Sequence, residues 1–149
     1  MTMEELLIKQ ELQELVVDYS RAVDTCDEAA LRALFHPDGV IDSGVLRAEP
    51  EQFARSYVKW VARNASVVFH AVTNVRFHVS GREATGECYV LAVSRVRADA
   101  AEAHAVADAS ERDVLTAGRY LDRFQAREGV WKFLERRFVP VHAVSWEAK

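Results

Sequence analysis

Apolar residues near the start of the chain recur at steps of three and four positions, the period of a helix with one buried face. Asp27 has the character of an N-cap, so a second helix is expected after it, ending near the break at 36–39. Pro50 lies in the first turn of a third helix that extends to about Asn64. The first helix is predicted from about Glu4 to Asp24, with an apolar stripe of Leu12, Leu15, Val16, Tyr19, Ala22 and Val23.

The period of the pattern changes from 3.6 to 2 near residue 65, and alternation of this kind predicts strands. Residues 39–47 predict a short hairpin with its turn at Ser43 and Gly44, and the alanine-rich, acidic segment 97–110 predicts a loop. Four long strands are expected at 66–79, 83–96, 111–127 and 130–144, with tight turns at 80–81 and 128–129.

Helices that precede strands indicate an α+β fold, with three N-terminal helices on one face of an antiparallel sheet. Strands of this length twist strongly, so the sheet should curve into a cone with an apolar interior, which suits a small apolar ligand. We expect residues 1–149 to form a single domain. The outer face of such a sheet has no cover, which predicts a homodimer or homotrimer, with Val75, Phe77 and Leu121 as candidate contacts.

The amino-acid composition and net charge of the chain limit the kinds of partner that it is expected to bind. Half of the 149 residues are hydrophobic and the net charge is −4, so a globular domain is expected and nucleic acid is not an expected partner. There is no apolar run of the ~20 residues that a membrane helix needs, and the N-terminus lacks a signal core, so a cytoplasmic location without membrane contact is expected. Cys26 and Cys88 stand far apart and are expected to be reduced thiols.

The sequence contains no metal-binding or cofactor-binding motif. Spacings such as His-x-His or His-Glu-x-x-His do not occur, so no metal site is predicted. The six glycines lie at predicted turns or singly in strands, and none forms a phosphate-binding loop. We therefore expect no cofactor.

Several segments resemble the SnoaL-like group of the nuclear transport factor 2-like superfamily. This resemblance covers nearly the whole chain and implies the cone-shaped, cystatin-like fold. The group contains dehydratases, isomerases, a dehydrochlorinase, polyketide cyclases and the small subunits of ring-hydroxylating dioxygenases, so it implies no single reaction. The segments are YSRAVD at 19–24, DGV at 38–40, FHAVTN at 69–74, GRYLDRF at 118–124, GVWK at 129–132 and RR at 136–137.

Asp24 and His70 are the first candidate site residues. The resemblance places them where bile-acid dehydratase and dehydrochlorinase members pair an aspartate at the end of the first helix with a strand histidine. Imidazole suits proton abstraction near neutral pH, and a carboxylate behind it would fix its tautomer. The alternatives are a core histidine bonded to a backbone carbonyl and a solvated acid at a helix end.

Tyr19 and Arg136 complete the candidate set. Tyr19 matches a tyrosine of the bile-acid dehydratase type, where the dehydrochlorinase has a lysine, and a buried phenol could donate to a developing oxyanion. Arg136 matches an arginine of the dehydrochlorinase and could be a second donor. The alternatives are a core tyrosine for Tyr19, and for Arg136 a sheet-face salt bridge with Glu135 or Asp122.

The other histidines fit the site less well. His36 precedes a helix-ending proline and is expected to be exposed, while His78 would share a face with His70 unless a bulge intervenes. His104 lies in the predicted loop and His142 near the C-terminus.

Three functions remain open on this basis. The first is a cofactor-independent lyase or isomerase, dehydratase-like, that uses an Asp-His dyad on a small apolar cyclic or carbonyl substrate. The second is an accessory module resembling a ring-hydroxylating dioxygenase small subunit, and the third is a pocket protein without catalysis. The dyad and Tyr19 favour the enzyme, because an accessory subunit does not need them.

Overall fold

The computed structural model describes residues 2–97 and 111–148. Its helices are α1 (Met3–Asp24), α2 (Glu28–Ala33) and α3 (Pro50–Asn64). The Asp27 carboxylate accepts from the backbone N–H of Ala30 at 2.9 Å, which is the N-cap expected for α2. The predicted loop lies, apart from Arg97, outside the described residues. Across the described ranges no helix is both long and apolar enough to cross a membrane.

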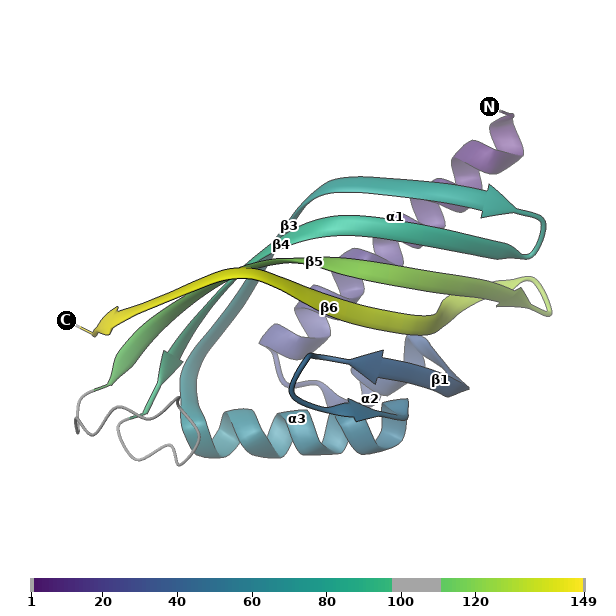
Figure 1. Ribbon diagram of the computed structural model, residues 1–149. Helices are drawn as coiled ribbons and strands as arrows, with labels where there is room; N and C mark the ends of the chain where they lie inside the picture. Colours follow the sequence, from purple (N-terminus) through teal and green to yellow (C-terminus); the bar gives the residue numbers. More distant parts are fainter. Residues whose placement is uncertain (1, 98–110, 149) are drawn as a thin grey trace.

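Six strands form one curved sheet in the order β2-β1-β6-β5-β4-β3 (Figure 1). With the helices N-terminal to the long strands, the predicted α+β class is confirmed. In Figure 1, α1 crosses behind the sheet and α3 lies along its lower edge, so the helices gather on the concave side, called here the inner face. The strands are β1 (Phe35–Asp42), β2 (Arg47–Ala48), β3 (Ala65–Ser80), β4 (Glu83–Val96), β5 (Arg112–Arg127) and β6 (Val130–Glu147).

The first strand departs from the prediction. Helix α2 ends at Ala33 and not near residue 36, and β1 starts at Phe35 and pairs with β6 in parallel, so the sheet is mixed and not wholly antiparallel. Pairing between β1 and β6 is irregular from Phe35 to Val40, the interval that contains Pro37. Proline has no N–H for a ladder, so an irregular stretch of this kind tolerates it inside a strand.

Asn74 changes which side chains of β3 reach the core. Its φ of 52° is left-handed, and the register with β4 shifts between Thr73 and Arg76. Such a bulge reverses the inward and outward alternation of a strand. Phe77 consequently packs inside, with its ring centroid 5.8 Å from that of Phe124. Val75 also packs against the core, so the prediction that these two residues belong to the outer face is wrong.

Gly86 makes room for this packing. A Cβ at this position would lie 2.9 Å from the Phe124 ring and 3.0 Å from the Phe77 ring. Any larger residue would therefore push the two rings apart, and a well-filled core does not absorb such a displacement without cost.

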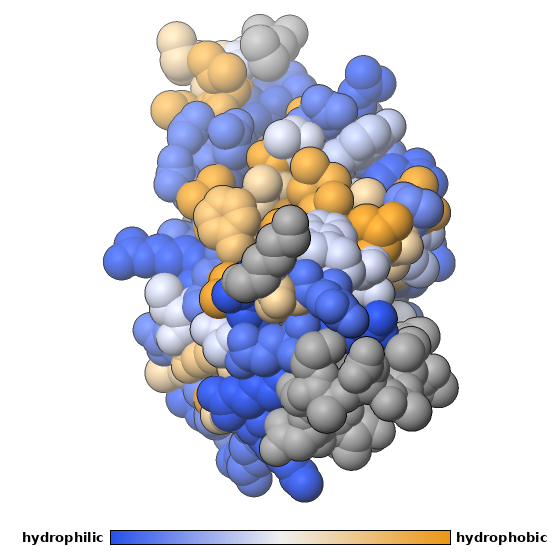
Figure 2. Space-filling model, turned by 90° about the vertical axis from the view of Figure 1, so that its left-hand side faces the viewer, coloured by the Kyte–Doolittle hydropathy of each residue, from blue (hydrophilic) through white to orange (hydrophobic). Residues whose placement is uncertain are grey.

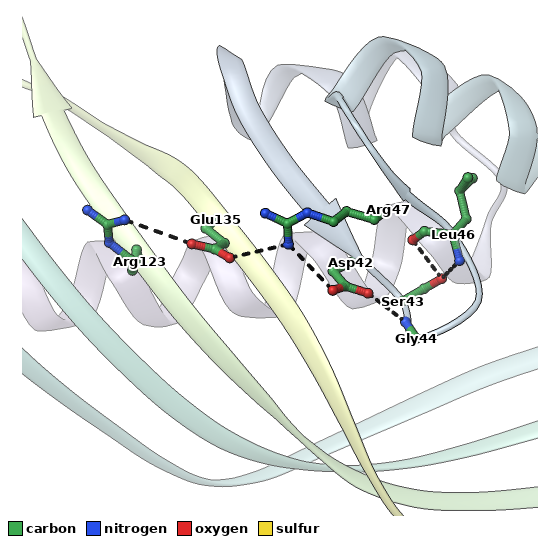
Figure 3. Close-up of polar contacts among 7 residues, drawn as sticks. All are labelled: Asp42, Ser43, Gly44, Leu46, Arg47, Arg123 and Glu135. Carbon is green, nitrogen blue, oxygen red and sulfur yellow. Dashed lines mark hydrogen bonds and ion pairs between the residues drawn. The ribbon is translucent and has the colours of Figure 1, made fainter.

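The hairpin of β1 and β2 is fixed to the sheet by polar contacts (Figure 3). The Asp42 carboxylate accepts from the Gly44 N–H at 3.0 Å, which closes the turn at the predicted Ser43-Gly44 position. Arg47 lies 3.5 Å from Asp42 and 3.6 Å from Glu135 of β6, and Glu135 also contacts Arg123 at 3.8 Å. This chain of exposed ion pairs joins β2 to β5 and β6, and each pair contributes little by itself.

Candidate active site

Asp24 and His70 are brought together from the end of α1 and the first half of β3. One carboxylate oxygen of Asp24 lies 2.6 Å from His70 Nδ1, and the other accepts from the His70 backbone N–H at 3.0 Å. An acid at the C-terminus of a helix is disfavoured by the helix dipole. These two bonds supply the local stabilisation that the position of Asp24 requires.

The hydrogen bond also determines the tautomer of His70. An ionised carboxylate only accepts, so the proton of the neutral ring lies on Nδ1 and the lone pair on Nε2. The side chains of His70 and Asp24 are 12% and 19% exposed, so the pair is largely shielded from water. Nε2 has no hydrogen-bond partner among the described residues and is not one of their buried unpaired atoms. The lone pair of Nε2 is therefore not used by the described residues.

Tyr19 lies on α1 in the core, with its ring packed edge-on against Tyr120 at a centroid distance of 5.7 Å. Burial raises the pKa of the Tyr19 phenol to about 12, although the Arg136 charge opposes this shift. The phenol stays protonated near neutral pH and can donate a hydrogen bond. Its oxygen has no hydrogen-bond partner among the described residues.

Arg136 is fully buried behind Tyr19 and does not face the outside of the sheet. Its Nε and Nη2 donate to the two carboxylate oxygens of Asp122, both at 2.8 Å. Its guanidinium carbon lies 4.3 Å from the Tyr19 ring centroid and 4.2 Å from that of Tyr120. Nη1 is buried without a hydrogen-bond partner in the described part of the chain. In this geometry the arginine is an ion-pair partner and an aromatic contact.

Asp122 and Arg136 form a strongly coupled pair. Burial raises the pKa of the Asp122 carboxyl, and the adjacent guanidinium opposes that shift. Burial alone would lower the pKa of Arg136, but the Asp122 carboxylate holds it above its ordinary value. The two bonds at 2.8 Å are those of an ionised pair, so the arginine keeps its charge.

Tyr57 of α3 was not among the site residues predicted from the sequence. Burial raises the pKa of its phenol, and the charges of Tyr19, Cys26 and Asp24 add to this shift. In the sequence it belongs to the apolar stripe of the third helix, where an aromatic residue is usually a core residue. The interaction with the Asp24 charge depends on how α3 crosses the sheet, which periodicity does not predict.

The other histidines lie away from the dyad. His36 is buried and its Nε2 is 2.8 Å from the carbonyl oxygen of Gln125, so the expectation that it is exposed is wrong, because it belongs to β1 and not to a helix end. His78 lines a hollow on the outer face, since the bulge at Asn74 separates it from His70. His142 is exposed, and His104 lies outside the described residues.

The surface of the described residues is hollowed in several ways, and two of its hollows bear on the site. One, of about 520 Å³, lies on the outer face among Arg76, His78, Leu121 and their neighbours. The other, of about 320 Å³, lies between α1 and Val75 of β3. Neither is lined by Tyr19, Asp24, His70 or Arg136, so these hollows are not the predicted cone pocket. Within residues 2–97 and 111–148 no group of three or more His, Cys, Asp or Glu is placed to hold a metal ion.

Comparison with known proteins gives the family. Solved structures similar to this chain include a candidate scytalone dehydratase from Novosphingobium aromaticivorans DSM 12444, with 21% identity and a TM-score of 0.78 over 100% of this chain and 94% of that one. Hexachlorocyclohexane dehydrochlorinase LinA-type3 from Novosphingobium barchaimii LL02 has 21% identity and a TM-score of 0.82 over 97% and 93%. A protein of unknown function with a cystatin-like fold from Nostoc punctiforme PCC 73102 has 20% identity and a TM-score of 0.70 over 91% and 92%.

At these identities the likeness shows the cystatin-like fold and not an activity. No curated protein matches the chain in sequence. The model of the SnoaL-like domain matches residues 4–137, which is most of the chain. The protein therefore belongs to the SnoaL-like domain family.

Proposed function

We propose that this protein is a cofactor-independent lyase of the dehydratase type that acts on a small, largely apolar cyclic carbonyl compound. The observation that carries the proposal is the orientation of His70, whose Nδ1 is held by Asp24 while Nε2 is open to a ligand. The dehydratase and dehydrochlorinase names among the structural neighbours are consistent with an elimination reaction.

The reaction begins when His70 Nε2 removes a proton from the carbon next to the carbonyl group. The electron pair of the broken C–H bond moves toward the carbonyl oxygen, where the Tyr19 phenol donates a hydrogen bond to the developing charge. Asp24 stabilises the imidazolium that forms. When the pair returns to form the C=C bond, a β-hydroxyl group departs, takes the proton back from His70 and leaves as water.

Arg136 supports this chemistry from behind Tyr19. Because it is fully buried and bound to Asp122, we assign it a positioning role and not the direct donor role that its place in the sequence suggested. Its charge lies against the Tyr19 ring and works against the rise in the pKa of the phenol. A phenol with a lower pKa is a stronger hydrogen-bond donor, so Arg136 helps Tyr19 to stabilise the oxyanion.

The test is the dehydration of a panel of cyclic β-hydroxyketones, followed by the absorbance of the enone product. We expect His70→Ala to lower turnover by at least ~10²-fold, the usual contribution of a positioned base. Tyr19→Phe should lower it ~10- to 10³-fold, since one oxyanion donor is lost. His142→Ala, which changes an exposed histidine on β6, is the control and should match the parent. A His70→Ala protein that is folded by circular dichroism and retains the parent rate would refute the proposal.

A further inference from the structure

His70 lies in a lateral row of residues that crosses the sheet. In the register of the strands, His70 of β3 stands opposite Ala92 of β4, Ala92 opposite Thr116 of β5, and Thr116 opposite Ala143 of β6. Pairing between β4 and β5 is regular from end to end, so neighbours in this row share one face of the sheet. Because His70 faces Asp24 of α1, that face is the inner one.

The same row lies where side chains of the inner face are less deeply buried. On β4, Cys88 and Val90 are fully buried on the inner face, but Ala92 is partly exposed. On β5, Tyr120 is buried, and Thr116 on the same face is partly exposed. The inner face is thus less tightly covered at Ala92 and Thr116 than at Cys88, Val90 and Tyr120, and it is closed again at Val96.

Thr116 contributes a polar group in this row. Its hydroxyl has no hydrogen-bond partner among the described residues and is not one of their buried unpaired atoms. Adjacent strands are about 4.8 Å apart, so His70 and Thr116, two strands apart, are separated by ~10 Å along the sheet. Among the described strands, Ala92 is the residue between them in this row, and a ring lying over its methyl group would reach both.

We propose that Thr116 is a substrate-binding residue of this site, which hydrogen-bonds a hydroxyl or carbonyl group at the end of the substrate remote from His70. Ala92 is the floor under the substrate ring and limits its thickness. The inference deepens the proposed function and rests on it. It specifies the substrate class as a flat ring compound with a second polar group opposite the carbon that loses the proton.

The probes are 1-indanone and 5-hydroxy-1-indanone, which differ by one hydroxyl at the far end of the ring. Binding is measured by ligand titration in NMR, and exchange of the ketone α-protons in D₂O is measured by mass spectrometry. Thr116→Val keeps the shape of the side chain and removes its hydroxyl. We expect it to weaken binding of the hydroxylated probe by ~3- to 10-fold, the value of one hydrogen bond, and to leave the other probe unaffected.

Two further variants give the controls. Thr73→Val makes the same change on the opposite face of β3 and should leave both affinities at the parent value. Ala92→Leu should weaken binding of both probes at least ~10-fold, because the larger side chain occupies the space proposed for the ring. Ala92→Ser, of similar size to the parent residue, should not weaken binding. Equal effects of Thr116→Val on the two probes, or binding of neither probe by the parent at millimolar concentration, would overturn the assignment of Thr116.

His70→Asn separates this inference from the proposed function. If Thr116→Val is selective and His70→Asn still exchanges α-protons at the parent rate, the Thr116 assignment stands and the proposed base is wrong. If His70→Asn abolishes exchange but Thr116→Val changes neither affinity, the reaction stands and the Thr116 assignment is wrong.

Discussion

The carboxylate of Asp24 holds His70 at two points, the ring Nδ1 at 2.6 Å and the backbone N–H at 3.0 Å. The second bond fixes the position of the carboxylate relative to the strand, and the first then fixes the ring. A core histidine bonded to a backbone carbonyl, the alternative left open by the sequence, would have no acid to stabilise its charged form.

Replacement of Asp24 by Asn tests this arrangement. The amide can still bond the backbone N–H of His70, but it carries no charge to stabilise the imidazolium. We expect Asp24→Asn to remain folded and to lose at least ~10²-fold in turnover of cyclic β-hydroxyketones. In ¹⁵N NMR the parent should show the Nδ1–H tautomer of His70 and the variant a mixture. A parent ring protonated mainly on Nε2 at neutral pH would contradict the proposed base.

The buried phenols predict loss of stability at high pH. Burial raises the pKa of Tyr19 to about 12, above the value of about 10 in an unfolded chain, so the folded state favours the neutral phenol. This contribution is fully present below pH ~10 and is lost as the pH rises toward 12, because the unfolded chain releases its proton first. Urea unfolding at pH 9, 10, 11 and 12 should show the decline.

Two variants test whether Tyr19 contributes to this loss of stability at high pH. Tyr19→Phe should have a shallower decline than the parent, because it removes one phenol that the fold keeps neutral. Tyr89→Phe, on the exposed outer face of β4, should decline like the parent. Identical slopes for the parent and Tyr19→Phe would show that Tyr19 titrates as it does in an unfolded chain.

The sequence predicted the long elements well because each has a uniform period. The turn at 128–129 and helices α1 and α3 appear as expected, whereas the turn after β3 lies one residue later, at 81–82, and α2 ends earlier, at Ala33. The hairpin at 39–47 was predicted, but the first half of β1, from Phe35, was missed because Pro37 and Gly39 normally interrupt secondary structure. At Gly39 the backbone passes so close to β6 that a Cβ would lie 3.0 Å from the Leu134 carbonyl oxygen. Only the packing of distant strands makes a glycine necessary there.

The faces of β3 were harder to predict than its length. Alternation alone puts Val75 and Phe77 on the face opposite His70 and Asn74, but the left-handed Asn74 inserts a bulge and moves them to the core. Asparagine tolerates this conformation better than most residues, yet a single asparagine in a strand is too weak a signal to predict a bulge. For Arg136, the sequence named the candidate ion-pair partners but could not predict that the side chain is buried. Its burial depends on Tyr19 and Tyr120, which pack on the guanidinium from distant parts of the chain.

The ion pair of Arg136 and Asp122 predicts a large effect on stability. Both side chains are buried, at 0% and 1% exposure, so removal of one leaves a charge without a partner in the core. We expect Arg136→Met to lower the free energy of unfolding by ~3–5 kcal/mol in urea titration. The exposed pair of Arg127 and Asp38 is the control, and Arg127→Gln should cost less than ~1 kcal/mol. A cost below 1 kcal/mol for Arg136→Met would mean that the pair is not buried in solution.

The outer face of the sheet predicts self-association. Register places Phe69, Val93, Leu115 and Val144 in one row across β3, β4, β5 and β6. Figure 2 views the end of the molecule at which β6 ends. It shows hydrophobic side chains gathered across the middle of the view. The large hydrophobic residues exposed in this region, which we call the outer patch, are Val67, Phe69, Leu91, Val144 and Trp146.

An apolar surface of this kind is costly to expose to water, and a sheet face can pack against a copy of itself around a symmetry axis. We therefore expect a dimer or trimer by light scattering at micromolar concentration. Leu91→Arg places a charge in the outer patch and should shift the protein toward the monomer, whereas Val45→Arg, in the exposed β1–β2 turn, should not. A monomeric parent, or a Leu91→Arg variant with the parent mass, would show that the outer patch does not join copies of the chain.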